Sequence, residues 1–114
     1  MGGLEVEDQT NMGHYIPVEA KDMSEMLVNV GDSLQRLTND VLTSVSHRVK
    51  VPVSLQAREE GGLAERYSIA YFAKVSRDQS LKPMPEFVKN GEKAKYEDIS
   101  AWDWNQLKLQ RIYG

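Results

Sequence analysis

The sequence predicts a mainly β fold with one or two short helices, of the sandwich or barrel kind. Short stretches of alternating or β-branched apolar residues recur through the first 72 residues, separated by Asn, Gly and Pro. Only two segments combine helical spacing with a capping residue. The 114 residues, 40% of them hydrophobic, are enough for one domain with a small core.

Five strands are expected, over residues 4–7, 15–18, 26–30, 41–53 and 66–72. The first alternates apolar and polar side chains, as a strand buried on one face does. Pro17 places the second strand at a sheet edge or strand end. The third is a nearly continuous apolar run, which predicts burial on both faces or a place in a sandwich core.

Two short helices are expected, over residues 33–38 and after Ser100. Leu34 and Leu37 lie three residues apart and predict the inner face of the first helix. Ser100 has the features of an N-cap, since Asp103 follows three residues later. Between the helices, residues 76–95 hold prolines, a glycine and many charges, which predicts an extended surface segment.

Composition excludes several classes of function. The net charge is −3 and acids are interleaved with the basic residues. Electrostatic binding to nucleic acid or to an anionic membrane is therefore not expected. The absence of cysteine excludes disulfides and thiolate metal sites and agrees with a cytoplasmic location. The sequence also contains no apolar run of transmembrane length and no signal-peptide pattern.

His47 is the first candidate for chemistry. Alternation in the strand of residues 41–53 places His47 on one face with Val45 and Val49, and Arg48 on the other. A neutral imidazole on a rigid strand suits Fe, Zn, Cu or Ni. The alternative is a histidine that only bonds to a neighbour within the fold.

Arg66 and Ser68 are the second candidate. They fall on one face of the predicted last strand, roughly 7 Å apart by strand rise. A guanidinium binds a carboxylate through two hydrogen bonds, and a hydroxyl adds a third. The alternative is an exposed Arg66 paired with Glu65 or Glu59, which contributes little stability.

Three segments in this order resemble the C-terminal half of the iron(II)- and 2-oxoglutarate-dependent oxygenases. The branch is the one that includes isopenicillin N synthase. The segments are NVGDSLQRLTND, SVSHRV and ERYSIAYF, at residues 29–40, 44–49 and 65–72. GGLEV, YIPV and LVNVGD look like the family's central strands, so the resemblance covers nearly the whole sequence.

The resemblance implies a partial double-stranded β-helix, the cupin-like jelly roll, with one or two short helices. It implies that His47 is the last ligand of a two-histidine, one-carboxylate Fe(II) site, and that Arg66 and Ser68 bind the far carboxylate of 2-oxoglutarate. The implied function is hydroxylation, desaturation or cyclisation of a small molecule in secondary metabolism, with ascorbate as a further candidate cofactor. No catalytic side chain beyond the metal ligand is predicted.

One departure from the family pattern concerns the other metal ligands. The family carries a His-x-Asp or His-x-Glu step before the GGLEV strand, whereas this sequence begins at that strand, and His14 is followed by Tyr15 and Ile16. We therefore expect a truncated chain, with residues 1–75 forming the C-terminal half of the oxygenase jelly roll and residues 76–114 an extended segment and short helix. An upstream half or a partner chain would complete the barrel. The alternative is a non-catalytic remnant or interaction module of the same fold.

Overall fold

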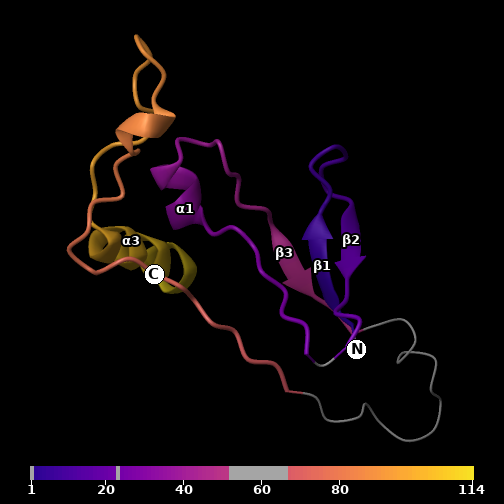
Figure 1. Cartoon of the computed structure of the whole chain (residues 1–114). Helices are drawn as coiled ribbons and strands as arrows, with labels where there is room; N and C mark the ends of the chain where they lie inside the picture. Colours follow the sequence, from indigo (N-terminus) through magenta and orange to yellow (C-terminus); the bar gives the residue numbers. More distant parts are fainter. Residues whose placement is uncertain (1, 23, 52–66) are drawn as a thin grey trace, which may run out of the picture. The chain divides into compact units, whose positions relative to one another are not determined.

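The computed structural model describes residues 2–22, 24–51 and 67–114 (Figure 1). Within these residues it contains strands β1 (Leu4–Glu7), β2 (Tyr15–Val18) and β3 (His47–Val49), helices α1 (Asp32–Leu37) and α3 (Ala101–Tyr113), and a 3-10 helix η1 (Pro85–Phe87). The chain divides into two compact units. The first comprises the described residues of 1–29 and 45–70, and the second comprises residues 30–44 and 71–114.

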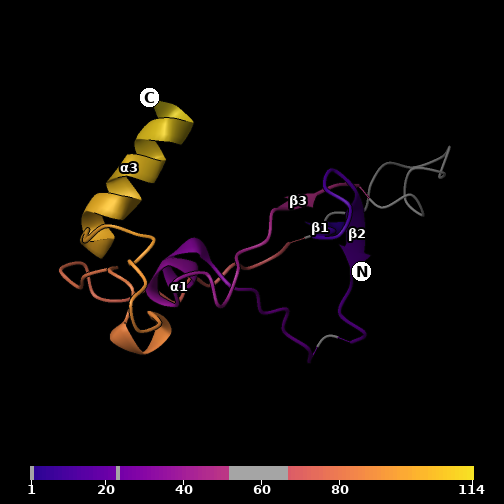
Figure 2. The same ribbon diagram turned by 90° about the horizontal axis from the view of Figure 1, so that it is seen from above.

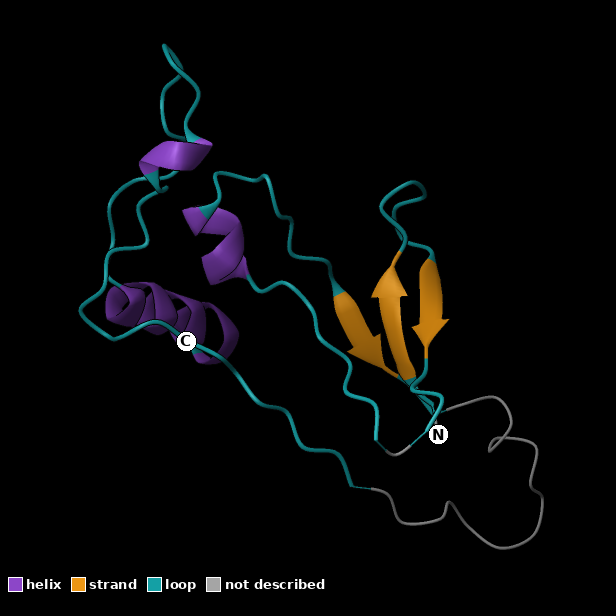
Figure 3. Cartoon of the chain, in the orientation of Figure 1, coloured by secondary structure: helices purple, strands orange, loops and turns teal. Residues whose placement is uncertain are grey.

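The first unit is built on an antiparallel sheet in the order β2-β1-β3 (Figure 3). Val6 of β1 pairs with Ile16 of β2 and with His47 of β3, while Leu4 pairs with Val18 and Val49. Cross-strand partners point to the same face, so these six side chains share one face of the sheet. That face is apolar except for His47.

A loop over residues 8–14 joins β1 to β2. The carboxylate of Asp8 accepts hydrogen bonds from the backbone N–H of Thr10 at 2.8 Å and from its hydroxyl at 2.6 Å. Gly13 has a φ of +86°, a conformation that a side chain at this position would disfavour. Pro17 lies in β2, an edge strand of the described sheet, as the sequence predicts.

The second unit packs its one fully buried apolar side chain among the described residues, Leu81, beside the start of α3. Leu81 is 1% exposed, and its N–H donates to the Ile99 carbonyl at 2.8 Å. Ser100 accepts a hydrogen bond from the Asp103 N–H at 3.0 Å, which confirms the predicted cap of α3. Figure 2 shows α3 from above, running to the C-terminal end of the chain.

Three predicted strands differ in the structure. Residues 26–30 and 67–72 form no strand. Of the predicted strand 41–53 the structure describes residues 41–51, and within these β3 covers only His47–Val49. Val28 is 87% and Ile69 98% exposed. Apolar alternation makes a segment suitable for a strand, but a strand forms only where a neighbour satisfies its backbone hydrogen bonds.

Two predictions about burial were also wrong. Helix α1 lies within one residue of its predicted bounds, yet Leu34 is 41% exposed while Arg36 is buried. The segment 76–95, predicted to be surface, contains Leu81. The predicted strands 4–7 and 15–18 and both predicted helices are present. No helix of the described residues combines the length and hydropathy needed to cross a membrane.

Candidate functional site

His47 begins β3 and lies opposite Val6 on the apolar face of the sheet. Backbone hydrogen bonds from Glu7 to Ser46 (2.8 Å) and from Lys50 to Gly3 (2.7 Å) join the two strands on either side of this position. Antiparallel pairs alternate between bonded and non-bonded, so Val6 and His47 form a non-hydrogen-bonded pair, where side chains approach most closely. The imidazole is exposed on this face.

The ring of His47 has one nitrogen next to a backbone acceptor. Nδ1 lies 3.3 Å from the carbonyl oxygen of Val45. In the tautomer that carries its proton on Nδ1, this nitrogen donates to the carbonyl and Nε2 keeps a free lone pair. Metal-bound histidines commonly have this arrangement, in which a backbone carbonyl orients the ring.

The described residues do not complete a metal site around His47. No group of three or more His, Asp or Glu side chains that could hold a metal ion occurs among them. The second histidine, His14, is exposed in the β1–β2 turn, with Nδ1 4.0 Å from an Asp8 carboxylate oxygen. One imidazole is too few ligands to define an Fe(II) site, so the ligand set in this part of the chain does not by itself fit the metal.

The predicted co-substrate pair is only partly within the described residues. Arg66 lies outside them, so its role stays a prediction. Ser68 is exposed and belongs to the same compact unit as His47, in a segment that forms no strand. The alternating geometry predicted for the two side chains is therefore not tested.

The opposite face of the sheet carries a charged cluster that sequence analysis did not identify. Nε of Arg48 bonds to the carboxylate of Glu5 at 2.6 Å, and its guanidinium lies 3.7 Å from the centroid of the Tyr15 ring. The three residues come from β3, β1 and β2. Alternation placed Arg48 opposite His47, but only the strand pairing reveals its partners.

In the second unit, Arg36 of α1 is enclosed by aromatic side chains. Its guanidinium lies 4.7 Å from the Tyr96 ring and 4.5 Å from the Trp104 ring, and Nη2 donates to the Glu97 carbonyl at 2.9 Å. The Asn39 side chain accepts from the Lys95 N–H at 2.9 Å. These contacts attach the segment around residue 96 to α1.

Asp40 completes this polar network. Its carboxylate accepts hydrogen bonds from the Tyr96 hydroxyl, from Gln35 at 3.0 Å and from Lys95 at 3.0 Å. These bonds, that of Tyr96 first, lower the pKa of Asp40 to about 2. The same bond to Asp40 is the main cause that raises the pKa of Tyr96. The network is structural, because the carboxylate of Asp40 is shared by the Tyr96, Gln35 and Lys95 side chains.

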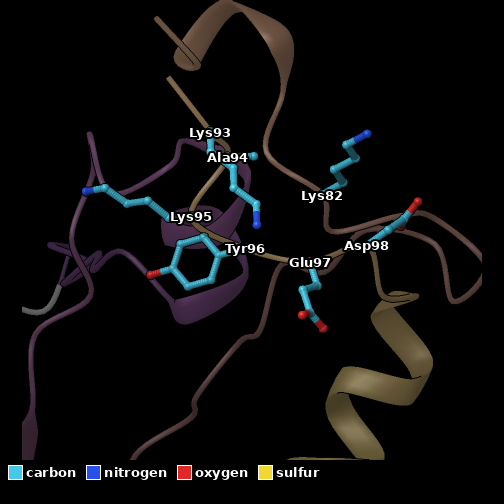
Figure 4. Close-up of a pocket in the computed structure, with 7 residues that line it drawn as sticks. All are labelled: Lys82, Lys93, Ala94, Lys95, Tyr96, Glu97 and Asp98. Atoms are coloured by element: carbon cyan, nitrogen blue, oxygen red, sulfur yellow. The ribbon is translucent and has the colours of Figure 1, made fainter. Parts of the chain in front are cut away.

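A pocket of about 490 Å³ lies beside this network, lined by Lys82, Lys93, Ala94, Lys95, Tyr96, Glu97 and Asp98 (Figure 4). The side chains of Lys82 and Lys95 extend away from each other, and two acids share the lining. The lysines therefore do not converge on one anion. The pocket belongs to the second unit, whereas His47 and Ser68 belong to the first.

Comparison with models of known protein families shows the family of the chain. The model of the 2OG-Fe(II) oxygenase superfamily matches residues 1–75. The chain belongs to this superfamily. Fe(II) and 2-oxoglutarate are the metal and co-substrate that this oxygenase family implies.

Curated fungal relatives match the chain along its whole length. It is 53% identical over 114 residues to the 2-oxoglutarate-Fe(II) type oxidoreductase ppzD of Metarhizium rileyi, covering 100% of this chain and 31% of that protein. It is 51% identical to the proline hydroxylase buaE of Petromyces alliaceus, covering 99% of this chain and 35% of that protein. The chain thus spans about a third of the length of the curated relatives it matches.

The structure of this chain also resembles parts of solved oxygenase structures. A 2OG-Fe(II) oxygenase family protein from Caulobacter crescentus matches with a TM-score of 0.73 and 32% identity, over 97% of this chain and 34% of that one. A full-length Neurospora crassa protein, solved in complex with alpha-KG, matches with a TM-score of 0.77 and 29% identity, over 96% of this chain and 31% of that one. The sheet and helices described above are therefore similar to parts of larger oxygenases.

Proposed function

We propose that this chain supplies the last metal ligand and the co-substrate anchor of an Fe(II)- and 2-oxoglutarate-dependent oxygenase. The observation that carries the proposal is the place of His47 on the apolar face of the sheet, with Nδ1 beside the Val45 carbonyl. That geometry leaves Nε2 free for a metal. Membership of the oxygenase superfamily supports iron as that metal.

Arg66 and Ser68 are proposed to bind the far carboxylate of 2-oxoglutarate. A planar guanidinium matches a carboxylate with two parallel hydrogen bonds, and the hydroxyl adds a third donor. Fe(II) held by His47 together with ligands from outside this chain would supply the chemistry that activates O₂. The substrate proposed is a small molecule of secondary metabolism, and the relative that is a proline hydroxylase makes a proline-like ring one candidate.

The remaining metal ligands are proposed to come from an upstream half or a partner chain. In this arrangement, residues 1–75 form the C-terminal half of a jelly roll, and residues 76–114 form the segment and helix that follow it. The apolar face around His47 is partly exposed, with Ile16 and Val49 open to solvent, and this supports the proposal because such a face in a complete barrel would point inward. A cytoplasmic location is part of the same proposal, since the oxygenase site needs no disulfide.

Paramagnetic Mn(II) tests the metal role of His47 in the 114-residue chain. Even a weak one-imidazole site broadens the NMR signals of the bound ring, so Mn(II) is expected to broaden the His47 ring protons before those of His14. His14 is the internal control in an Asp8→Asn background, because the Asp8 carboxylate, 4.0 Å from the His14 ring, would otherwise hold Mn(II) there. Equal broadening of both rings, or none at His47, would contradict the proposal.

2-Oxoglutarate added to the same sample tests the anchor. It is expected to shift the Ser68 amide signal in the wild type and to leave it unshifted in Arg66→Ala. Arg66→Lys keeps the charge without the bidentate geometry and should retain only part of the response. A shift that survives in Arg66→Ala would refute the anchor.

The alternative function is a non-catalytic remnant or interaction module of the same fold. Both functions agree with the absence of a three-ligand cluster among residues 2–22, 24–51 and 67–114. The coding DNA on the 5′ side of Met1 separates the two functions. A His-x-Asp or His-x-Glu step there, in frame, is expected if the chain contributes to an active oxygenase.

A further inference from the structure

On the sheet face opposite His47, the Arg48 side chain of β3 contacts both other strands of the described sheet. Arg48 lies in β3 and bonds to Glu5 in β1 at 2.6 Å, and it stacks on Tyr15 in β2 at 3.7 Å. The Glu5 side chain is 21% and the Arg48 side chain 40% exposed, so solvent reaches the cluster only in part. Arg48, which follows His47 in β3, thus links this strand to β1 and to β2.

The position of His47 depends on the register of β3. With Val6 opposite His47, the imidazole lies on the apolar face. Side chains alternate with a period of two, so a slip of one residue would move His47 to the charged face and Arg48 to the apolar face. The register therefore decides whether the imidazole is on the proposed metal side of the sheet.

Backbone hydrogen bonds alone specify the register of β3 only weakly. The strand is three residues long and lies at an edge of the described sheet. By alternation Glu5–Arg48 is the one hydrogen-bonded pair within the strand, and the bonds Glu7–Ser46 and Lys50–Gly3 join the pairs on either side. Short edge strands with few ladder bonds slip readily unless side chains specify the pairing.

We propose that Arg48 is a positioning residue that keeps His47 on the apolar face by binding Glu5 and Tyr15. The guanidinium suits this because it donates in its plane to a carboxylate while its flat face stacks on a ring. A lysine has the charge but not the plane, so it cannot make both contacts in the same way. The consequence for function rests on the proposed role of His47 as a metal ligand.

Cross-strand NOEs in the full 114-residue chain report the register directly, without metal. The wild type is expected to show strong Hα–Hα NOEs for the non-hydrogen-bonded pairs Val6–His47 and Leu4–Val49. Arg48→Gln is expected to lose both NOEs, and Arg48→Lys to weaken them. Lys50→Gln is the matched control, since it removes a positive charge from the same segment without touching the cluster.

A second pair of variants keeps the test informative if Arg48→Gln disrupts the first unit as a whole. Tyr15→Leu removes the stacking ring, whereas Tyr15→Phe keeps it. The NOEs are expected to weaken in the first and to persist in the second. The α3 signals, which belong to the other unit, serve as a check that the remaining chain is folded.

Mn(II) broadening then tests whether the register of β3 controls metal binding at His47. Arg48→Gln is expected to lose the selective broadening of His47, and Lys50→Gln to keep it. Wild-type NOEs retained in both Arg48→Gln and Tyr15→Leu would overturn the positioning role. A wild-type chain with the expected NOEs but no broadening at His47 would instead contradict the proposed function and leave the register result intact.

Discussion

At the scale of single residues, the turn after α1 depends on two side chains that tolerate a left-handed backbone. Asn39 has a φ of 50° and Asp40 a φ of 67°. Asn and Asp adopt this region more easily than other non-glycine residues. Asn39 then reaches Lys95 and Phe87, and Asp40 reaches Tyr96, so the turn directs both side chains into the network of the second unit.

The lowered pKa of Asp40 predicts acid sensitivity of this unit. The carboxyl has a pKa of about 2 when folded, against 3.8 as its ordinary value, so the unfolded chain binds more protons between these values. The stabilisation is therefore present above about pH 4 and is lost as the pH falls toward 2. Trp104 fluorescence in urea, measured from pH 5 to 2, should show this loss.

Asp40→Asn provides the comparison for that measurement. The amide does not titrate, so the variant is expected to be less stable than the wild type at pH 5 and to lose less stability on acidification. Other carboxyls with a lowered pKa, such as Asp32, titrate in both proteins and cancel in the difference. An identical pH dependence in the two proteins would exclude Asp40 as a source of the effect.

At the scale of elements, local signals were predicted well and pairing was not. The cap at Ser100 and the strand over residues 4–7 each depend on residues close in sequence, and each is present. The residues 26–30 have a strand's composition but no strand partner among the described residues. Arg36 was missed for the same reason, because Tyr96 and Trp104, which enclose it, are distant in sequence.

In the candidate site too, features set by nearby residues could be predicted, and features set by strand pairing could not. The face of His47 could be predicted from alternation alone, whereas its partner Val6 and the Arg48 cluster depend on which strands pair. Resemblance to a family supplied the roles of Arg66 and Ser68, which alternation could only place on a common face. Physical reasoning from a single sequence does not give a ligand set whose members lie far apart in the chain.

Ser100→Ala tests how far α3 depends on its local cap. The hydroxyl accepts from the Asp103 N–H at 3.0 Å and donates to its carboxylate at 2.6 Å. Removing it should destabilise the helix by about 1 kcal/mol, and Ser100→Thr should restore most of the loss. Urea unfolding monitored by circular dichroism at the helix band gives the comparison. Equal stability of Ser100→Ala and wild type would show that the cap contributes nothing.

At the scale of the whole molecule, much apolar surface among the described residues faces solvent. Ile69 is 98%, Tyr71 87% and Val28 87% exposed. Surfaces of this kind bind other apolar surfaces or cause association. The 114-residue chain is thus expected to bind the dye ANS and to associate with rising concentration.

Ile69→Lys and Leu81→Ala separate exposed from buried apolar residues. The first should reduce ANS fluorescence and change the free energy of unfolding by no more than about 0.5 kcal/mol. The second removes a side chain that is 1% exposed, and it should cost about 2–5 kcal/mol. ANS fluorescence and urea unfolding measure the two effects. A larger loss of stability in Ile69→Lys than in Leu81→Ala would contradict the burial that distinguishes them.

Pro17 also bears on how copies of this chain can meet. The N–H of Asp8 bonds to the His14 carbonyl at 2.8 Å, so by alternation Val6–Ile16 is a hydrogen-bonded pair and Glu5–Pro17 is not. The nitrogen of Pro17 therefore faces away from β1, toward the outer edge of β2. It has no hydrogen to donate there, so the edge lacks one of the donors that a strand from another molecule would need. The proline thus acts against fibril-like growth of the sheet through β2 without weakening the pairing inside it.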